Sequence, residues 1–255
     1  MEFIDTHTHC TDEAFAGCEE EIIARAVNAG VTKMILADID SSERESMLEL
    51  CRKHKGVLFP MLGLYPGSVN GGWKEEMDIM ISHYSSDIVA VGEIGLDYHY
   101  GTEYAKEQME AFRAQLELAA KWNLPVNIHL RDATEDFFKV LSECSNLGLR
   151  GNIHAFSGSY ETFLRCQKYG HWKIGVGGVV TFKNAALAES VRKIPLEMIV
   201  LETDAPYLAP TPLRGTRNES ANIPLIAAKI AELKGTGIEK VAEVTSDNAK
   251  ELFSI

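Results

Sequence analysis

Two histidines, His7 and His9, stand two positions apart near the start of the chain, at the end of a short run rich in apolar and β-branched residues. Side chains two apart on a β-strand point to the same face, so both imidazoles are expected to converge. Imidazole and carboxylate groups together are common ligands of divalent metal ions. Further side chains of these types follow later runs of the same kind: Glu93, His129, His154 and Asp204.

Each of these residues alone has a simpler interpretation. His129 could be a hydrogen-bonded core histidine, Glu93 a partner for Arg131, and Asp204 the cap of a turn. A His-x-His pair also arises readily by chance among 8 histidines in 255 residues. Imidazoles and carboxylates gathered at one end of one fold are expensive to bury unless they bind a cation. Their shared position therefore favours a metal site.

The elements that would position these side chains are short apolar or β-branched runs, which alternate with longer amphipathic segments. No linker rich in Pro, Gly or Ser interrupts this alternation. The expected strands cover residues 2–7, 32–37, 57–63, 88–93, 125–129, 150–154, 172–176 and 198–203. The expected helices start near Asp12, Ser42, Lys74, Glu103, Thr134, Tyr160, Asn184 and Ser220, and a last helix covers residues 238–253.

Eight strand–helix units in 255 residues predict an α/β fold, a single (β/α)8 TIM barrel that forms one domain over residues 1–255. The alternative is an open doubly wound sheet. That fold usually carries a Gly-rich phosphate loop after its first strand, where this chain has His7 and His9. Active sites of TIM barrels form at the carboxyl ends of the strands, where all the candidate ligands fall.

Composition agrees with one globular domain, since 45% of the residues are hydrophobic and 24% are charged. The five cysteines include no Cys-x-x-Cys pair, which argues against a zinc ribbon or a disulfide framework. No run is apolar enough to span a membrane, and the first residues lack the basic start of a signal peptide, so we expect a cytoplasmic protein. The net charge of -12 argues against a protein that coats nucleic acid by long-range attraction.

The candidate ligands outnumber the needs of one tetrahedral ion, but they suit two ions about 3.5–4 Å apart with a bridging carboxylate. The expected cofactors are therefore two divalent ions, one held by His7, His9 and Asp204, the other by His129 and His154, with Glu93 as the bridge. Ligation rich in imidazole favours zinc or manganese, and magnesium stays open.

Residues two positions before each ligand should face the same way, one layer deeper in the barrel. Such layers are normally branched aliphatic, yet here they are polar: Asp5, Asn127, Asn152 and Glu202. We interpret this set as partners that orient the imidazoles and balance the charge of the metal, with ordinary buried hydrogen bonding as the alternative. Loss of Asp5 or Glu202 is then expected to lower metal affinity about tenfold or more.

Several segments resemble the TatD family of metal-dependent hydrolases. They are Asp5-Thr6-His7-Thr8-His9, Gly92-Glu93-Ile94-Gly95-Leu96-Asp97-Tyr98, His129-Leu130-Arg131, His154-Ala155-Phe156-Ser157-Gly158-Ser159, Glu202-Thr203-Asp204-Ala205-Pro206-Tyr207-Leu208 and Arg214-Gly215-Thr216-Arg217-Asn218-Glu219. The resemblance covers essentially the whole chain. It implies a TIM-barrel phosphodiesterase, typically a DNase that acts with divalent metal, and metal ligands at the same six positions.

One departure from this family lies after the third expected strand. The family usually has a histidine before proline there, in a Gly-x-His-Pro turn, where this chain has Tyr65 in Gly63-Leu64-Tyr65-Pro66. A phenol has an ordinary pKa near ~10, so Tyr65 cannot replace imidazole chemistry at neutral pH. It can still donate a hydrogen bond to a phosphate oxygen.

The expected function is that of a deoxyribonuclease that cleaves phosphodiester bonds with a hydroxide activated by two ions. Glu93 and Asp204 are the expected catalytic residues, and Asp204 would accept the proton. Groups expected to bind the phosphates of a DNA substrate are Tyr65, Arg131, Lys183, Arg214 and Arg217, with surface salt bridging as the alternative for the basic ones. Rings that could stack on bases are Tyr65, Tyr98, Tyr100, Phe156 and Tyr207.

No known DNA-reading motif occurs in the sequence, so we expect DNA recognition that is not sequence-specific. The oligomeric state stays open.

Two alternatives to a deoxyribonuclease remain. One is an amidohydrolase-like enzyme that cleaves esters or amides, including the deacylation of aminoacyl nucleic acid. Two-metal enzymes of that kind often use a modified lysine on the fourth strand, where this chain has Glu93. The other is a non-catalytic metal-binding module that retains all the ligands.

Overall fold

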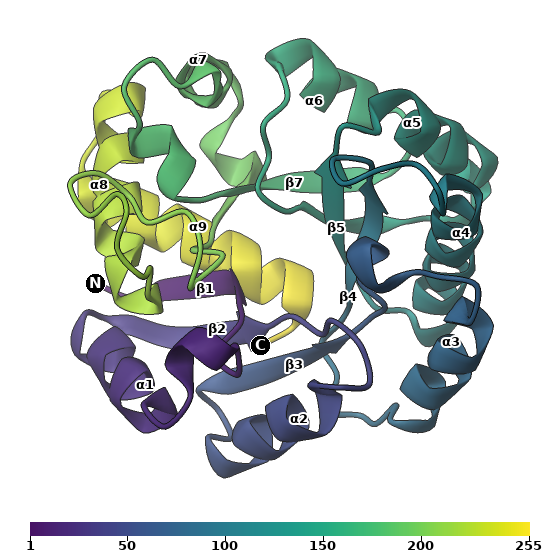
Figure 1. Cartoon of the computed structure of the whole chain (residues 1–255). Helices are drawn as coiled ribbons and strands as arrows, with labels where there is room; N and C mark the ends of the chain where they lie inside the picture. Colours follow the sequence, from purple (N-terminus) through teal and green to yellow (C-terminus); the bar gives the residue numbers. More distant parts are fainter.

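Eight parallel strands form one sheet whose order in space follows the order in sequence, from β1 to β8 (Figure 1). The computed structural model describes all residues 1–255. Its strands are β1 (Phe3–Thr8), β2 (Val31–Leu36), β3 (Leu58–Leu62), β4 (Ala90–Asp97), β5 (Val126–Arg131), β6 (Arg150–Ile153), β7 (His171–Val176) and β8 (Ile199–Leu201). With helices between them, these strands confirm the predicted (β/α)8 barrel.

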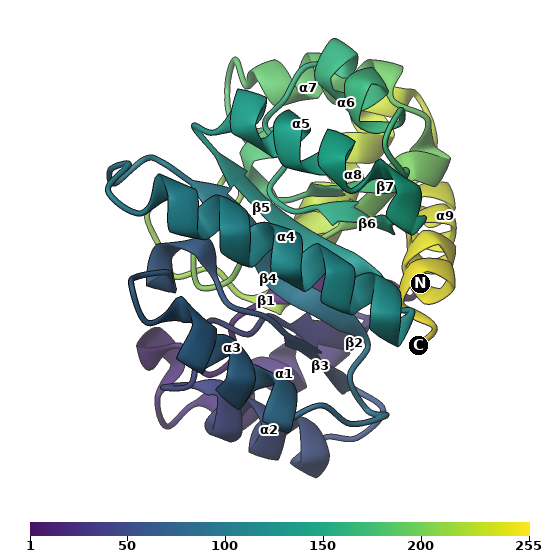
Figure 2. The same cartoon turned by 90° about the vertical axis from the view of Figure 1, so that its right-hand side faces the viewer.

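The helices form the outer layer, and Figure 2 shows the long α4 lying along the outside of the strands. They are α1 (Glu19–Asn28), α2 (Arg44–Lys53), α3 (Trp73–Ser82), α4 (Ala105–Trp122), α5 (Thr134–Glu143), α6 (Tyr160–Cys166), α7 (Ala186–Lys193), α8 (Ile223–Lys234) and α9 (Ile238–Phe253). Their apolar faces supply much of the main hydrophobic core between helices and sheet.

The helix predicted to start near Asp12 starts later than expected. Asp12 caps a short 3-10 turn, Glu13–Phe15, by accepting a hydrogen bond from the backbone of Ala14, and α1 begins only at Glu19. The helix predicted to start near Ser220 is α8, which begins at Ile223 after a 3-10 turn over residues 220–222. A polar residue that can cap a helix also stabilises a single isolated turn, so the sequence signal is the same for both.

The barrel closes between β8 and β1 through hydrogen bonds that lie largely beyond the end of β8. The backbone N–H of Asp204 donates to the carbonyl of His7 at 3.0 Å, and that of His9 donates to the carbonyl of Ala205 at 2.9 Å. The Thr6 hydroxyl donates to the Leu201 carbonyl at 3.0 Å. This closure brings the segment after β8 against the His7 and His9 strand.

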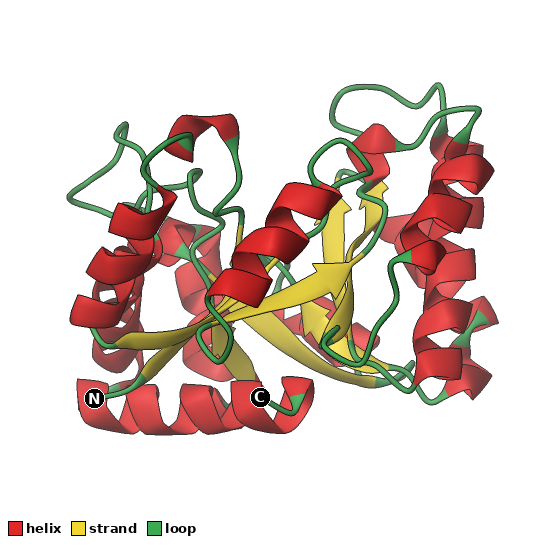
Figure 3. Cartoon of the chain, turned by 90° about the horizontal axis from the view of Figure 1, so that it is seen from below, coloured by secondary structure: helices red, strands yellow, loops and turns green.

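The amino ends of the strands are closed by α9, which lies across that end of the barrel (Figure 3). Leu252 and Phe253 of α9 pack in one buried cluster with apolar side chains from five strands, namely Ile4, Ile35, Met61, Ala90 and Val200. This layer is buried and apolar, as expected for a barrel interior. The end of the barrel that remains open for an active site is therefore the one formed by the carboxyl ends of the strands.

All five cysteines are free, as the sequence analysis predicted, and four of them are buried. None of the helices is both long and apolar enough to span a lipid bilayer.

Candidate metal centre

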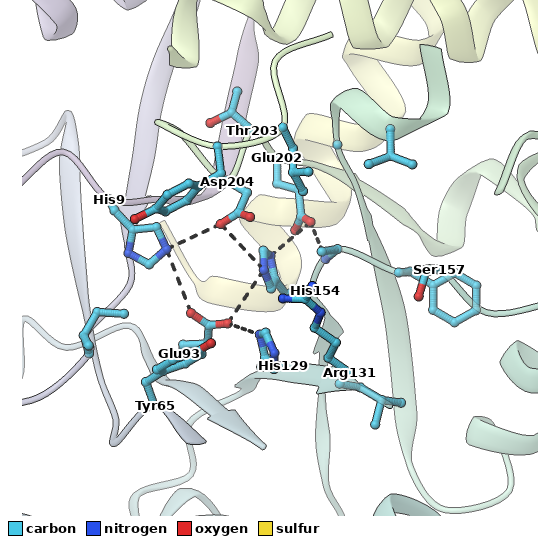
Figure 4. A pocket seen from close by; sticks show the side chains of 18 of the residues that line it. His9, Tyr65, Glu93, His129, Arg131, His154, Ser157, Glu202, Thr203 and Asp204 are labelled. Atoms are coloured by element: carbon cyan, nitrogen blue, oxygen red, sulfur yellow. Dashed lines mark hydrogen bonds and ion pairs between the residues drawn. The ribbon is translucent and has the colours of Figure 1, made fainter. Parts of the chain in front are cut away.

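Five side chains meet at the carboxyl end of the barrel, two from strands β1 and β4 and three from the segments that follow β1, β6 and β8 (Figure 4): His7, Glu93, His9, His154 and Asp204. The Nε2 atoms of His7 and His9 are 3.1 Å apart, and they lie 3.5 and 3.4 Å from Oδ1 of Asp204. Nε2 of His154 lies 3.7 Å from the same oxygen. Ligand atoms of His7, His9 and Asp204 form one group within 4.8 Å, and those of His7, Glu93 and His154 form another.

Glu93 divides this cluster into two halves. Its Oε2 atom faces the β1 histidines, at 3.5 Å from His7 Nε2 and 3.9 Å from His9 Nε2. Its Oε1 atom faces the other way, at 2.7 Å from His129 Nδ1 and 3.7 Å from His154 Nε2. A carboxylate whose two oxygens face two separate sets of imidazoles has the geometry of a bridging ligand.

The polar residues beneath the cluster act on it in different ways. Asn127 Oδ1 lies 2.9 Å from His7 Nδ1, and Glu202 Oε1 lies 3.1 Å from His154 Nδ1, so the Nε2 atoms of both rings face the cluster. Asn152 acts indirectly, by accepting a hydrogen bond from Asn127 at 3.1 Å. Second partners of this kind fix the tautomer and the orientation of a metal-binding imidazole.

Asp5, the fourth of these residues, touches no imidazole. Its carboxylate accepts hydrogen bonds from the backbone of His7 at 3.2 Å and from the backbone and hydroxyl of Thr203 at 3.0 and 2.5 Å. Complete burial raises the pKa of Asp5 to about 7. Asp5 therefore joins the first and last strands rather than orienting a ring.

Glu202 reaches His154 because β7 carries a glycine where the two strands come closest. A Cβ atom at Gly175 would overlap the Glu202 carboxylate. The same carboxylate accepts a hydrogen bond from the backbone of Ala155 at 2.5 Å. Glu202 thus holds both the ring of His154 and the turn that follows it.

The charges of the cluster suit a cation. Burial opposes charge on His154, but the carboxylates of Glu202 and Asp204 raise the pKa of this imidazole to about 10. Burial also opposes ionisation of Glu93, but His7 and His129 hold the pKa of Glu93 well below its usual range. Burial and the neighbouring His154 lower the pKa of His7 to about 3, so this ring stays neutral, as a ligand must. The donors and the partners that orient them fit divalent metal ions, and a bound ion would replace the proton that the surrounding carboxylates favour on His154.

His129 lies at the edge of the cluster, and sequence reasoning missed its second partner. Its Nε2 atom is 2.9 Å from Oδ2 of Asp97, a residue buried at the end of β4. Burial opposes charge on His129, but Asp97 and Glu93 raise the pKa of this ring to about 9. Asp97 stands four positions after Glu93, so the same two-residue period could have found it. The predicted strand, however, ended at Glu93, whereas β4 continues to Asp97.

The cluster opens into a cavity of about 700 Å³ at the carboxyl face. Of the predicted substrate-binding residues, Tyr65 and Arg131 line it, and Lys183, Arg214 and Arg217 do not. Arg217 instead donates to the Ala14 carbonyl at 2.7 Å and pairs with Glu219 at 3.1 Å. The predicted rings that line the cavity are Tyr65, Tyr100, Phe156 and Tyr207. The hydroxyl of Tyr98 is occupied by Asp136 at 3.0 Å.

The cavity also has an acidic side that sequence reasoning missed. Asp12, from the loop after β1, and Glu43, from the loop after β2, both line it. The Tyr207 hydroxyl donates to Asp12 at 2.6 Å, and no basic side chain pairs with either carboxylate. Nothing in the local sequence distinguishes these residues from ordinary surface acids, because their role depends on which loops face the cavity.

The fold is a (β/α)8 barrel, and imidazoles and carboxylates cluster at its open end. These two features together define a class of protein, the metal-dependent hydrolases. The sequence model of the family described as TatD related DNase matches residues 4–254. The chain belongs to this family.

Relatives and solved structures agree with this assignment over nearly complete lengths. The chain is 37% identical over 254 residues to the uncharacterized metal-dependent hydrolase YabD of Bacillus subtilis, with 98% of each chain covered. It is 33% identical to the 3'-5' ssDNA/RNA exonuclease TatD of Pantoea ananatis, covering 98% of this chain and 99% of the other. The crystal structure of YJJV, a TatD homologue from Escherichia coli, superposes with a TM-score of 0.89 at 30% identity, covering 99% and 98%.

Proposed function

We propose that this protein is a deoxyribonuclease, a single-domain enzyme over residues 1–255 that hydrolyses phosphodiester bonds with two divalent ions. The observation that carries the proposal is the position of Glu93, whose two oxygens face two different sets of imidazoles. Paired ions about 3.5–4 Å apart are characteristic of enzymes that cleave phosphodiesters. The exonuclease named among the relatives supports nucleic acid as the substrate.

In this proposal His7, His9 and Asp204 would hold one zinc, manganese or magnesium ion, His129 and His154 would hold the other, and Glu93 would be the ligand shared between them, the division expected from the sequence. Such a pair of ions supplies a water molecule with a pKa lowered toward ~7 and stabilises negative charge on the phosphate. Asn127 and Glu202 keep the rings of His7 and His154 turned toward the ions.

Asp204 is suited to accept the proton of the attacking water. Its side chain is 17% exposed to the cavity, whereas that of Glu93 is 4% exposed. Burial opposes its ionisation, but His154 and His9 lower the pKa of Asp204, so it is ionised at neutral pH. A carboxylate that is both ionised and open to the cavity can receive a proton and pass it to solvent.

The substrate contacts follow from the cavity walls. Arg131 offers a guanidinium that can fork onto phosphate oxygens, and Tyr65 offers a hydroxyl. The exposed ring of Tyr100 offers a stacking surface that does not distinguish among bases. These contacts favour binding that is not sequence-specific.

The test is cleavage of end-labelled single-stranded and double-stranded DNA by the purified protein with magnesium, manganese or zinc. We expect shortened products only with metal, and a loss of about 100-fold or more in Asp204→Asn. The matched control Asp247→Asn changes an exposed carboxylate on α9 and should retain full activity.

DNA that stays intact with two ions bound per chain would contradict the nuclease and favour an ester or amide substrate, including aminoacyl nucleic acid. Failure to turn over any such substrate would favour a non-catalytic metal-binding module.

A further inference from the structure

We propose that a DNA strand leaves the metal centre on one side only, between the loops after β5 and β6, where a second cavity binds the next phosphate of the strand. This inference rests on the proposed function and names the path of its substrate. Arg131 and Ser157 lie on this side of the centre, away from His9 (Figure 4).

The second cavity is a continuation of the first. It has a volume of about 220 Å³, several times the ~30 Å³ that one water molecule occupies, so a phosphate with its hydration fits. It shares with the larger cavity the walls formed by Leu130, Arg131, His154, Phe156 and Ser157. Thr134 and Thr162 complete it with hydroxyl groups. A chain of phosphates can therefore pass from one cavity into the other along Arg131.

Arg131 is unusual among the ten arginines of this chain. Eight of the others donate hydrogen bonds to protein groups, and Arg214, which does not, lies outside both cavities. The Arg131 guanidinium has no carboxylate partner and rests over the ring of Tyr100, 5.4 Å from its centre. An unpaired guanidinium held by an aromatic ring is ready to bind phosphate.

The one carboxylate that lines the second cavity, that of Asp132, already has a partner within the protein. Asp132 lines the second cavity, but its Oδ2 atom lies 3.0 Å from Nδ1 of His99. The His99 ring in turn packs edge-on against Tyr100. Tyr100 itself is 84% exposed, so a base next to the bound phosphate can stack on it.

The opposite side of the centre repels phosphate. In a ring of eight strands ordered β1 to β8, the β1 and β2 loops lie across the barrel from the β5 and β6 loops. The β1 and β2 loops carry Asp12 and Glu43, which line the cavity without a basic partner. Their negative charges repel the negative charge of a phosphate. The strand therefore continues past Arg131, and only its terminal residue faces Asp12 and Glu43.

The experiment compares two substrates, thymidine oligonucleotides with one and with three phosphodiester bonds, in the presence of manganese. The wild-type protein should cleave the longer one with a kcat/KM about tenfold higher, because only that substrate reaches the second cavity. In Arg131→Ala this ratio should fall close to one. Arg52→Ala, which removes an exposed arginine on α2, should keep the wild-type ratio.

A second readout needs neither metal nor turnover. Binding of a labelled single strand is measured with a chelator present at several salt concentrations. Each lost phosphate contact should reduce the slope of log affinity against log salt by about 0.7, and we expect this change in Arg131→Ala but not in Arg52→Ala.

The possible results distinguish the proposed strand path from the proposed nuclease activity. Equal kcat/KM for both substrates, or equal effects of the two arginine variants, would overturn the strand path and leave the nuclease intact. No cleavage of either substrate with any metal would contradict the nuclease and the path together.

Discussion

Both ring nitrogens of His129 lie within hydrogen-bonding distance of carboxylates, Nδ1 at 2.7 Å from Glu93 and Nε2 at 2.9 Å from Asp97. Tyr65 completes this arrangement: its hydroxyl donates to Asp97 at 3.3 Å, and its ring packs edge-on against that of His129. The position where the family usually has a histidine thus holds a neutral donor here. Burial and the nearby Glu93 and Asp97 raise the pKa of Tyr65 further above its usual range, so it stays a phenol.

Asp97→Asn tests whether this carboxylate prepares His129 for metal. The amide keeps the size of the side chain but removes the charge that faces Nε2. We expect metal affinity to fall about 10-fold or more, measured by competition with a chromophoric chelator. Asp132→Asn, which changes an exposed carboxylate beside His99, is the control. Equal affinities in wild type and Asp97→Asn would show that Asp97 has only a structural role.

Tyr65→Phe tests the hydroxyl that stands in place of an imidazole. Loss of one hydrogen bond near the substrate should lower kcat/KM on DNA about fivefold, while metal affinity stays the same. Tyr98→Phe removes a hydroxyl that bonds Asp136 outside the cavity and should have little effect on cleavage. A fall in metal affinity of Tyr65→Phe instead would assign Tyr65 to the metal centre rather than to the substrate.

At the scale of elements, most of the predicted site followed from the alternation of side chains along a β-strand, which places every second residue on the same face. It brought His7 and His9 to one face and placed Asn127 and Glu202 in the layer beneath the ligands, but the rings that these two residues contact, His7 and His154, come from other strands. It failed at the fourth strand, which was predicted to end at Glu93, two residues before the next position on the same face. In the structure β4 continues through Gly95, which has a φ of 139° and lies against the backbone of His129.

The long segment between β8 and α8 depends on a cluster of charges around Glu219. Arg25 of α1 donates to this carboxylate at 2.7 and 2.9 Å, and Arg217 donates at 3.1 Å. Burial favours the protonated form, but the two arginines lower the pKa of Glu219 below its ordinary value. The cluster therefore ties the segment that carries the family's signature to the first helix.

Glu219→Gln should lower the free energy of unfolding by about 1 kcal/mol at neutral pH, as measured by urea denaturation. A carboxylate with a lowered pKa contributes stability above the pKa of the unfolded state and loses it as pH falls through the pKa of the folded state. The difference between variant and wild type should therefore shrink as pH falls below the ordinary glutamate pKa of about 4.3. Glu189→Gln, at an exposed pair on α7, should change little. A difference that is constant with pH would contradict the electrostatic account.

At the scale of the whole molecule, the barrel could be predicted because eight alternating units in 255 residues allow few other folds. The distribution of charge around the cavity, with two acids on one side and Arg131 on the other, could not be predicted. Asp12, Glu43 and Arg131 lie far apart in sequence, and only closure of the ring sets the two acids across from the arginine. The charged cluster lies at one end of a barrel that α9 closes at the other end. We therefore expect that a metal ion bound to the cluster stabilises the entire fold.

Removal and return of metal test this link. A saturating ion, at about 100 times its Kd, stabilises the folded state by about 2.7 kcal/mol, so manganese should raise Tm by roughly 5–10 °C over protein held in chelator. The variant His7→Ala, which lacks a candidate ligand of the first ion, should show a smaller rise. Equal Tm values with and without metal would contradict a metal centre at this position.

The most direct test of the account is a titration of metal-free protein with manganese, in which bound ions per chain and the rate of single-stranded DNA cleavage are measured on the same samples. Glu93 between two sets of imidazoles predicts that cleavage stays low through the first equivalent and reaches its maximum as the second binds. Full activity at one ion per chain, or intact DNA at two, would contradict it.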